Sequence, residues 1–188
     1  MQYAIGADPA GGVGKDNSVI EVYCLNTGQQ VAEWVSNTIA PDTFATHIAE
    51  LGEEYNKAFL TVESNNHGVV TIDELMDIYD VNLIYQKERT QGTREQPKLM
   101  STGFRTTART KPLMIGKLRK MLAKTLTIYS SILADELSTF VEHEDGSMGA
   151  QEGCMDDTVM ASANCVMGWE EAAIYTMDGR DRDWETSS

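Results

Sequence analysis

The first 37 residues contain three segments with the pattern of β-strands, separated only by short turns. Residues 3–8 (YAIGAD) form the first segment, residues 18–25 alternate apolar and polar side chains as a half-buried strand does, and residues 29–37 form the third. The connections are a glycine-rich stretch at 9–17 and the turn signal Asn26-Thr27-Gly28. Strands joined in this way form an antiparallel meander, so the fold must be built around a sheet.

Helical and strand-like segments then alternate. A helix is predicted from Pro41 to about Asn56, because its apolar residues recur at helical spacing, and the apolar run 58–62 follows it. A strand that follows a helical crossover pairs parallel with an earlier strand. A second helix near 67–79 and a strand at 81–86 complete this part of the sequence. The expected fold class is therefore α/β, with a mixed sheet flanked by helices.

The second half is predicted to be mainly helical. Residues 87–103 read as a mobile loop or a β-hairpin, and further predicted elements are a helix from Thr110 or Lys111 to Lys124, a short helix near 130–137, a hairpin around Asp145-Gly146 and a helix from Met155 to Ala173. We expect one domain over residues 1–175 and a flexible polar tail at 176–188.

Composition indicates the cellular compartment in which the chain functions. No apolar run approaches the roughly 20 residues that cross a bilayer, and the N-terminus lacks the pattern of a signal peptide, so neither a membrane role nor secretion is expected. Cys24, Cys154 and Cys165 are odd in number and form no CxxC pair, which argues against a disulfide framework or a structural zinc site and favours a reducing cytoplasm. All three are expected to be small buried side chains.

Charge is distributed unevenly along the chain. The net charge is −14, yet residues 87–124 hold eleven basic side chains against Glu88 and Glu95, which gives this segment +9 and the remainder −23. A basic segment on an otherwise acidic protein is suited to binding a polyanion at one place on the surface. A solvated helix and loop would explain the same composition equally well.

Carboxylates stand at three positions where a fold of this class exposes side chains. Asp8 ends the first strand, Glu63 follows the strand after the first helix, and Asp156 and Asp157 begin the last helix. Because ligands gather outside the carboxyl ends of strands in an open α/β sheet, these acids are expected to meet. Simple N-capping is the alternative role for Asp156 and Asp157.

Clustered carboxylates repel one another, and divalent cations remove that repulsion. Oxygen ligands favour Mg²⁺ or Mn²⁺, and two such ions promote hydrolysis of a phosphodiester. An ATP site is excluded, because GGVGKD lacks the first glycine and the Ser or Thr of a phosphate-binding loop. His67, four residues after Glu63, is a candidate to approach the acids, although a plain surface or capping role is the favoured interpretation of its position.

Four motifs occur in order: DPAGGVGKDNS, VESNNHG, GFRTTARTKP and GCMDDTVMASA. Together, over residues 3–168, they resemble the C-terminal nuclease domain of the large terminase subunit of tailed bacteriophages. The resemblance implies a ribonuclease H-like fold and an endonuclease that cuts concatemeric viral double-stranded DNA during genome packaging with two metal ions, Mg²⁺ or Mn²⁺. It implies metal binding and catalysis by Asp8, Glu63, Asp156 and Asp157, without deciding which of the last two binds metal directly.

The same resemblance assigns further residues and partners. Asp16 matches a second acid of the first motif, the DNA-facing cations are Arg105, Arg109, Lys111 and Lys117, and Met155 stands where the family often has histidine. The resemblance also implies an N-terminal packaging ATPase domain, a portal and a small terminase subunit as partners, with action in the cytoplasm of an infected bacterium. Because the chain opens on the first nuclease strand and has no Walker motif, we expect an isolated, monomeric domain.

Three other functions fit parts of the pattern. Another ribonuclease H-superfamily nuclease, such as a Holliday-junction resolvase or a ribonuclease H, would share the acids, but the GF…TKP motif and the basic segment favour a terminase. A non-catalytic DNA-docking module would be expected to have an incomplete set of acids. Half of an actin-like ATPase would need a second domain, for which 188 residues are too few.

Overall fold

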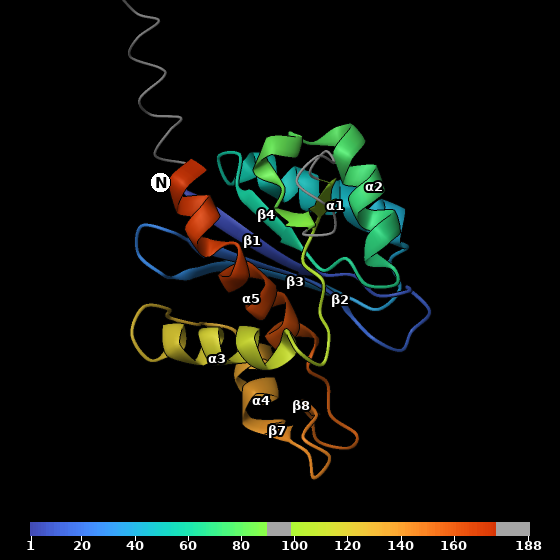
Figure 1. Cartoon of the computed structure of the whole chain (residues 1–188), viewed down its shortest axis with the longest axis vertical. Helices are drawn as coiled ribbons and strands as arrows, with labels where there is room; N and C mark the ends of the chain where they lie inside the picture. The colour runs from blue at the N-terminus through green and yellow to red at the C-terminus, as the bar shows by residue number, and fades with distance from the viewer. Residues whose placement is uncertain (90–98, 176–188) are drawn as a thin grey trace, which may run out of the picture.

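A four-stranded mixed sheet forms the centre of the computed structural model, which describes residues 1–89 and 99–175 (Figure 1). Its strands lie in the order β3-β2-β1-β4. They are β1 (Tyr3–Asp8), β2 (Ser18–Cys24), β3 (Gln30–Ser36) and β4 (Phe59–Val62). The first three form the predicted antiparallel meander, and β4 pairs parallel with β1, as the helical crossover between them requires.

Helices cover both faces of this sheet. One face carries α1 (Pro41–Glu54) and α2 (Gly68–Ile78), and the other carries α3 (Lys111–Leu122), α4 (Ser131–Thr139) and α5 (Asp157–Met167) (Figure 1). The core is accordingly divided into two apolar clusters, one on each side of the sheet. Every residue of β2 is buried, which corrects the prediction of a half-buried strand, because this central strand has helices on both sides.

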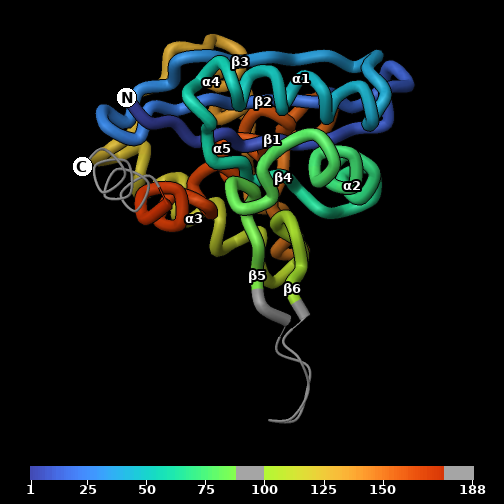
Figure 2. Tube along the Cα trace, turned by 90° about the horizontal axis from the view of Figure 1, so that it is seen from above, coloured from blue at the N-terminus to red at the C-terminus, as the bar shows by residue number. Residues whose placement is uncertain are grey.

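Two short hairpins extend the fold. One consists of β5 (Gln86–Arg89) and β6 (Leu99–Thr102) and projects away from the sheet (Figure 2). This pairing confirms the hairpin alternative for the described part of 87–103. The other consists of β7 (Phe140–Glu142) and β8 (Met148–Ala150) and surrounds the predicted Asp145-Gly146 turn. The predicted tail at 176–188 lies outside the described residues.

The predicted strand at 81–86 is wrong. Residues Val81–Leu83 form a 3-10 turn, in which the Asp80 side chain accepts a hydrogen bond from the backbone N–H of Asn82. Only Ile84 then bridges to Leu60 of β4. A local aspartate cap competes here with the strand ladder, so β4 is the last full strand at this edge. Beyond it, the described residues add only isolated bridges, from Ile84 to Leu60 and from Phe104 to Glu63.

Two smaller differences concern the last helix and a cysteine. The last helix is interrupted at Gly168, after which residues 169–175 are again helical, so Met155–Ala173 is not one uninterrupted helix. Cys154 is exposed and not buried, whereas Cys24 and Cys165 are buried as expected. In the described part of the chain, no helix combines the length and apolar character needed to span a membrane.

Candidate active site

The fold brings the four predicted acids to one end of the sheet. Asp8 is the last residue of β1, and Glu63 directly follows β4, its backbone N–H donating to the carbonyl of Ala7 at 3.0 Å. Since β1 and β4 are parallel neighbours, their carboxyl ends coincide. The helix α5 packs across β1 and β2, and Asp156 and Asp157 stand at its first turn, so carboxylates far apart in sequence share one location.

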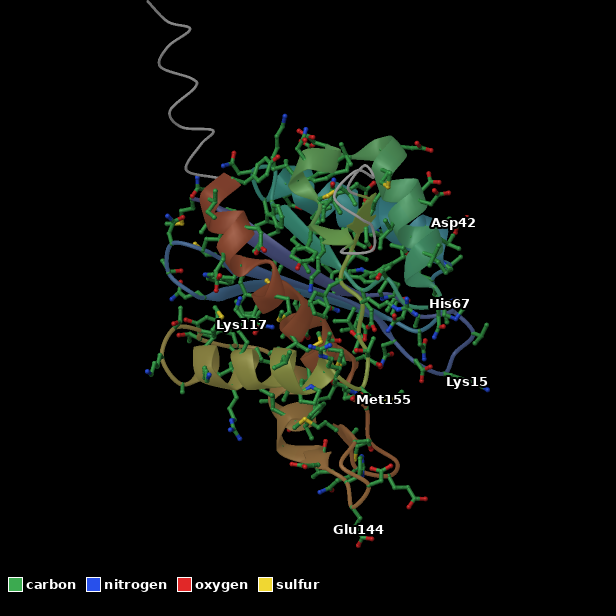
Figure 3. The ribbon with its side chains drawn as sticks, viewed as in Figure 1. Lys15, Asp42, His67, Lys117, Glu144 and Met155 are labelled. Carbon is green, nitrogen blue, oxygen red and sulfur yellow. The ribbon has the colours of Figure 1, made fainter. Side chains whose placement is uncertain are left out.

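A polar pocket of about 270 Å³ opens at this point. It is lined by residues from the end of β1, the glycine-rich turn, the segment after β4 and the start of α5: Asp8, Pro9, Ala10, Asp16, Asn17, Glu63, Asn65, Asn66, His67 and Asp157. Lys15, His67 and Met155, which belong to three of these segments, lie toward the same end of the sheet in Figure 3. Asp16 and His67 thus line the same pocket as Asp8, Glu63 and Asp157, and their roles stay predictions.

Asp8 carries the strongest electrostatic signature in the pocket. Burial raises the pKa of its carboxyl group well above 3.8, and a hydrogen bond with Glu63 and the negative charges of Glu63, Asp157 and Asp156 raise this pKa further. The pKa of Asp157 is also raised, first by burial, against the opposing effect of its hydrogen bonds with Asn17. The protein on its own therefore holds these carboxylates against their mutual repulsion.

This arrangement predicts how stability depends on pH. Because the pKa of Asp8 is higher in the folded than in the unfolded chain, its contribution to the free energy of unfolding is fully present below the unfolded pKa of 3.8 and is lost as pH rises through the folded pKa. In EDTA, the melting temperature of Asp8→Asn minus that of the wild type is therefore expected to increase as pH rises. Scanning calorimetry across that range checks it, and a constant difference at all pH values would contradict it.

Three side chains hold individual acids in place. The backbone N–H and the Nδ2 group of Asn17 both donate to Asp157 Oδ2 at 2.9 Å. Asn65 Nδ2 donates to Glu63 Oε1 at 2.7 Å, and also to the carbonyl of Thr106 at 2.7 Å. Neither asparagine was predicted from the sequence, although each stands within two residues of a motif acid, in the strings KDN and ESN.

The third is Lys111, at the start of α3. Its ammonium group lies 3.1 Å from Asp156 Oδ2 and 5.6 Å from the centre of the Phe140 ring, with about a quarter of the side chain exposed. Asp156 makes no side-chain cap for its own helix, so N-capping does not explain its presence. Lys111 therefore brings a fixed positive charge to the edge of the acidic pocket.

The other predicted DNA-facing cations are placed differently. Arg105 is exposed and lines a second pocket, of about 570 Å³, that shares Asn65 and Asn66 with the acidic one. Arg109 is exposed in the loop before α3. Lys117 pairs with Glu170 at 3.2 Å and lies along α3, away from Met155 (Figure 3). The fold thus brings Lys111 to the acids and places Arg105 in the neighbouring pocket, and it does not bring Lys117 to either place.

The donor set fits a hard divalent cation in its chemistry. All four acids offer oxygen, the ligand type that Mg²⁺ and Mn²⁺ prefer. Asp8, Glu63 and Asp157 line the pocket, where no described cysteine joins them, and Asp156 lies beside its lining, paired with Lys111. Within residues 1–89 and 99–175, however, no three His, Cys, Asp or Glu side chains are placed as a ready-made ligand shell. The asparagine and lysine contacts explain this, since they hold Glu63, Asp157 and Asp156 separately.

The mixed sheet of three antiparallel strands and one parallel strand, flanked by helices on both faces, matches the ribonuclease H-like fold of solved terminase nucleases. Among solved structures, the chain is similar to the large terminase nuclease of thermophilic phage G20c with bound magnesium, at a TM-score of 0.67 and 21% identity over 88% of this chain and 80% of that one. It is also similar to the large terminase nuclease domain of Thermus phage P74-26, at a TM-score of 0.65 and 21% identity over 90% and 80% of the two chains.

A more distant likeness is to the large terminase nuclease domain of bacteriophage SPP1 with bound manganese, at a TM-score of 0.51 and 14% identity over 88% and 85% of the two chains. No protein-family model and no curated protein matches the sequence. At these identities, the solved structures establish the fold alone.

Proposed function

We propose that the chain is a metal-dependent endodeoxyribonuclease, and specifically the nuclease domain of a phage large terminase subunit. The observation that carries the proposal is the convergence of Asp8, Glu63, Asp156 and Asp157 at one end of a ribonuclease H-like sheet. The magnesium- and manganese-bound terminase nucleases of the same fold support it. Three of the four sequence motifs that resemble the terminase family supply all the residues that line this pocket. The remaining motif, GFRTTARTKP, supplies the Thr106 carbonyl that accepts from Asn65 and the Lys111 side chain beside Asp156.

These four carboxylates are the proposed ligands of two divalent cations, Mg²⁺ or Mn²⁺. When bound, the cations supply Lewis-acid stabilisation for phosphodiester hydrolysis. Asn17 and Asn65 orient Asp157 and Glu63, and Lys111 offers its charge to a phosphate beside Asp156. Asp16 and His67 have proposed secondary roles at the rim of the pocket, where both are exposed.

The proposed substrate is double-stranded DNA, cut with little sequence preference because hydrolysis of the backbone needs no reading of bases. Arg105, Arg109 and Lys111 are proposed to contact it, and Lys117 stays a weaker candidate because of its ion pair with Glu170. We further propose a monomeric nuclease domain over residues 1–175. The packaging ATPase, portal and small terminase subunit are its proposed partners, in the cytoplasm of the infected host.

Plasmid cleavage tests this function. Supercoiled plasmid should be nicked and linearised in Mn²⁺ or Mg²⁺, but not in Ca²⁺ or EDTA. A four-way junction and a linear duplex of the same sequence should be cut at similar rates. Strong preference for the junction would favour a resolvase instead, and folded protein that binds DNA without cutting it in any metal would favour a docking module.

The placement of Lys111 gives a separate prediction on DNA binding. Lys111→Ala should weaken binding and reduce the slope of log K against log salt by about 0.9, the value of one lost phosphate contact. Lys120→Ala is the matched control, because Lys120 is exposed on the same helix. Fluorescence anisotropy in Ca²⁺ between low and moderate salt measures both slopes. Equal slopes for wild type and Lys111→Ala would argue against the phosphate contact.

A further inference from the structure

The first turn of α5, which carries two of the proposed metal ligands, is capped by a side chain from another helix. Glu136 on α4 accepts hydrogen bonds at Oε2 from the backbone N–H groups of Thr158, at 2.8 Å, and Val159, at 3.3 Å, and from the hydroxyl of Thr158. The residue in the N-cap position is Asp156, and it makes no cap hydrogen bond. A glutamate 22 residues upstream of Thr158 thus does what the N-cap residue ordinarily does.

Because Glu136 caps the helix in place of the N-cap residue, the carboxylates of Asp156 and Asp157 can make other contacts. Aspartate is among the preferred N-cap residues, and a carboxylate that accepts the free N–H groups of its own helix is turned away from other ligands. Here Glu136 satisfies the second and third N–H groups, and Asp156 faces Lys111 instead. Asp157, the first residue of the helix, reaches Asn17 in the glycine-rich turn.

Glu136 is itself held firmly. Its exposed fraction is 8%, and a buried carboxylate persists only where donors satisfy it. The start of α4 is anchored to the sheet, because Gln30 Oε1 on β3 accepts from the N–H groups of Tyr129 at 2.7 Å and Ser130 at 2.9 Å. Gln30 in turn donates to the buried Glu21 of β2 at 2.6 Å. A continuous set of contacts therefore runs from the central sheet through α4 to the first turn of α5.

We propose that Glu136 is a positioning residue of the metal site: by capping α5 it keeps the carboxylates of Asp156 and Asp157 from turning onto the N–H groups of their own helix. Both carboxylates therefore stay on the side of Lys111 and Asn17, where divalent cations would bind. This inference rests on the proposed function, since it concerns ligands of the same site. Glu136 lies under the helix and not among the residues that line the acidic pocket, so it acts through α5 and does not touch the substrate.

The test measures Mn²⁺ binding to the full chain by calorimetry, together with the Mn²⁺ dependence of plasmid cleavage. Glu136→Ala should raise the dissociation constant for Mn²⁺ about 10-fold or more, as loss of a residue that orients a metal ligand does. Glu136→Gln, which keeps an acceptor oxygen, should show a clearly smaller increase. At saturating Mn²⁺, the KM for DNA should stay within about twofold of wild type for both, because the DNA-contacting residues are unchanged.

Two controls separate positioning from general loss of structure. Asp135→Ala alters the exposed neighbour of Glu136 and should leave Mn²⁺ affinity unchanged. Leu133→Ala removes a core side chain of the same helix, 1% exposed, and should lower the melting temperature without weakening Mn²⁺ binding. Amide hydrogen exchange should accelerate at Thr158 and Val159 in Glu136→Ala and not in Asp135→Ala, which reports on the cap directly.

The outcomes distinguish failure of the role of Glu136 from failure of the metal site itself. Normal Mn²⁺ binding by wild type and by folded Glu136→Ala would overturn the role of Glu136 and leave the metal site standing. An equal loss of affinity in Leu133→Ala, at an equal loss of melting temperature, would also overturn it. Absence of Mn²⁺ binding by the wild type would overturn the metal site, and this inference with it.

Discussion

Replacing Asp8 with asparagine is expected to reduce metal-dependent DNA cleavage by about 100-fold or more, since loss of even an orienting partner of a metal ligand costs 10- to 100-fold. The asparagine would keep the size of the side chain but lose the charge at the centre of the cluster, where Glu63, Asp156 and Asp157 all act on Asp8. The same substitution should stabilise the metal-free protein at neutral pH, because it removes a carboxyl group whose ionisation the fold opposes.

Opposite effects on activity and stability make this prediction specific. A mutation that simply damaged the fold would lower both quantities. Asp77→Asn is the matched control, because Asp77 is exposed in the last turn of α2, roughly 15 Å of helix away from the turn that faces the pocket. Cleavage rates and melting temperatures in EDTA should both be near wild type in Asp77→Asn. Cleavage by Asp8→Asn at the wild-type rate would rule out Asp8 as a ligand.

Replacing Gly6 with alanine is expected to cost about 3 kcal/mol or more in the free energy of unfolding, through overpacking. Gly6 lies in β1 beneath α5, where an added Cβ would stand 2.0 Å from the carbonyl oxygen of Ala161 and 2.5 Å from the backbone nitrogen of Cys165. Both atoms belong to helix backbone, so no side chain can move aside and the whole of α5 must shift. Urea unfolding measures the loss.

Gly116 provides the matched control for Gly6. It lies within α3, and a Cβ added there would meet no other atom within 4 Å. Gly116→Ala should therefore stabilise the protein by about 0.5–1 kcal/mol, because alanine loses less backbone entropy in a helix. A cost below about 1 kcal/mol for Gly6→Ala would contradict the close approach of α5 to β1.

The sequence allowed prediction of the central sheet because its signals are local. The three meander strands are separated by turn residues, and the crossover helix determines that β4 lies parallel to β1. The error at 81–86 arose where a local aspartate cap overrides an apolar strand pattern at the sheet edge. The complete burial of β2 was also missed, because burial on the second face depends on α5, which lies more than a hundred residues further along the chain.

In the candidate site, too, features with a local sequence signal were predictable and contacts between distant segments were not. The acids and their convergence were predictable, because strand ends and helix starts mark them in the sequence. The contacts that hold them were not, because each joins segments far apart in the chain: Asn17 to Asp157, and Lys111 to Asp156. The role of Glu136 could not be predicted from the sequence, because a glutamate in an amphipathic helix is ordinarily solvated. In the structure, Glu136 is buried beneath another helix.

The measurement that most directly tests the central claim is the location of Mn²⁺ by anomalous scattering from crystals of the protein soaked in Mn²⁺. The arrangement of Asp8, Glu63, Asp156 and Asp157 predicts anomalous peaks in the pocket between the ends of β1 and β4 and the start of α5. Peaks bound only elsewhere on the acidic surface, with this pocket empty at saturating Mn²⁺, would contradict the assignment of these carboxylates as a metal-dependent nuclease site.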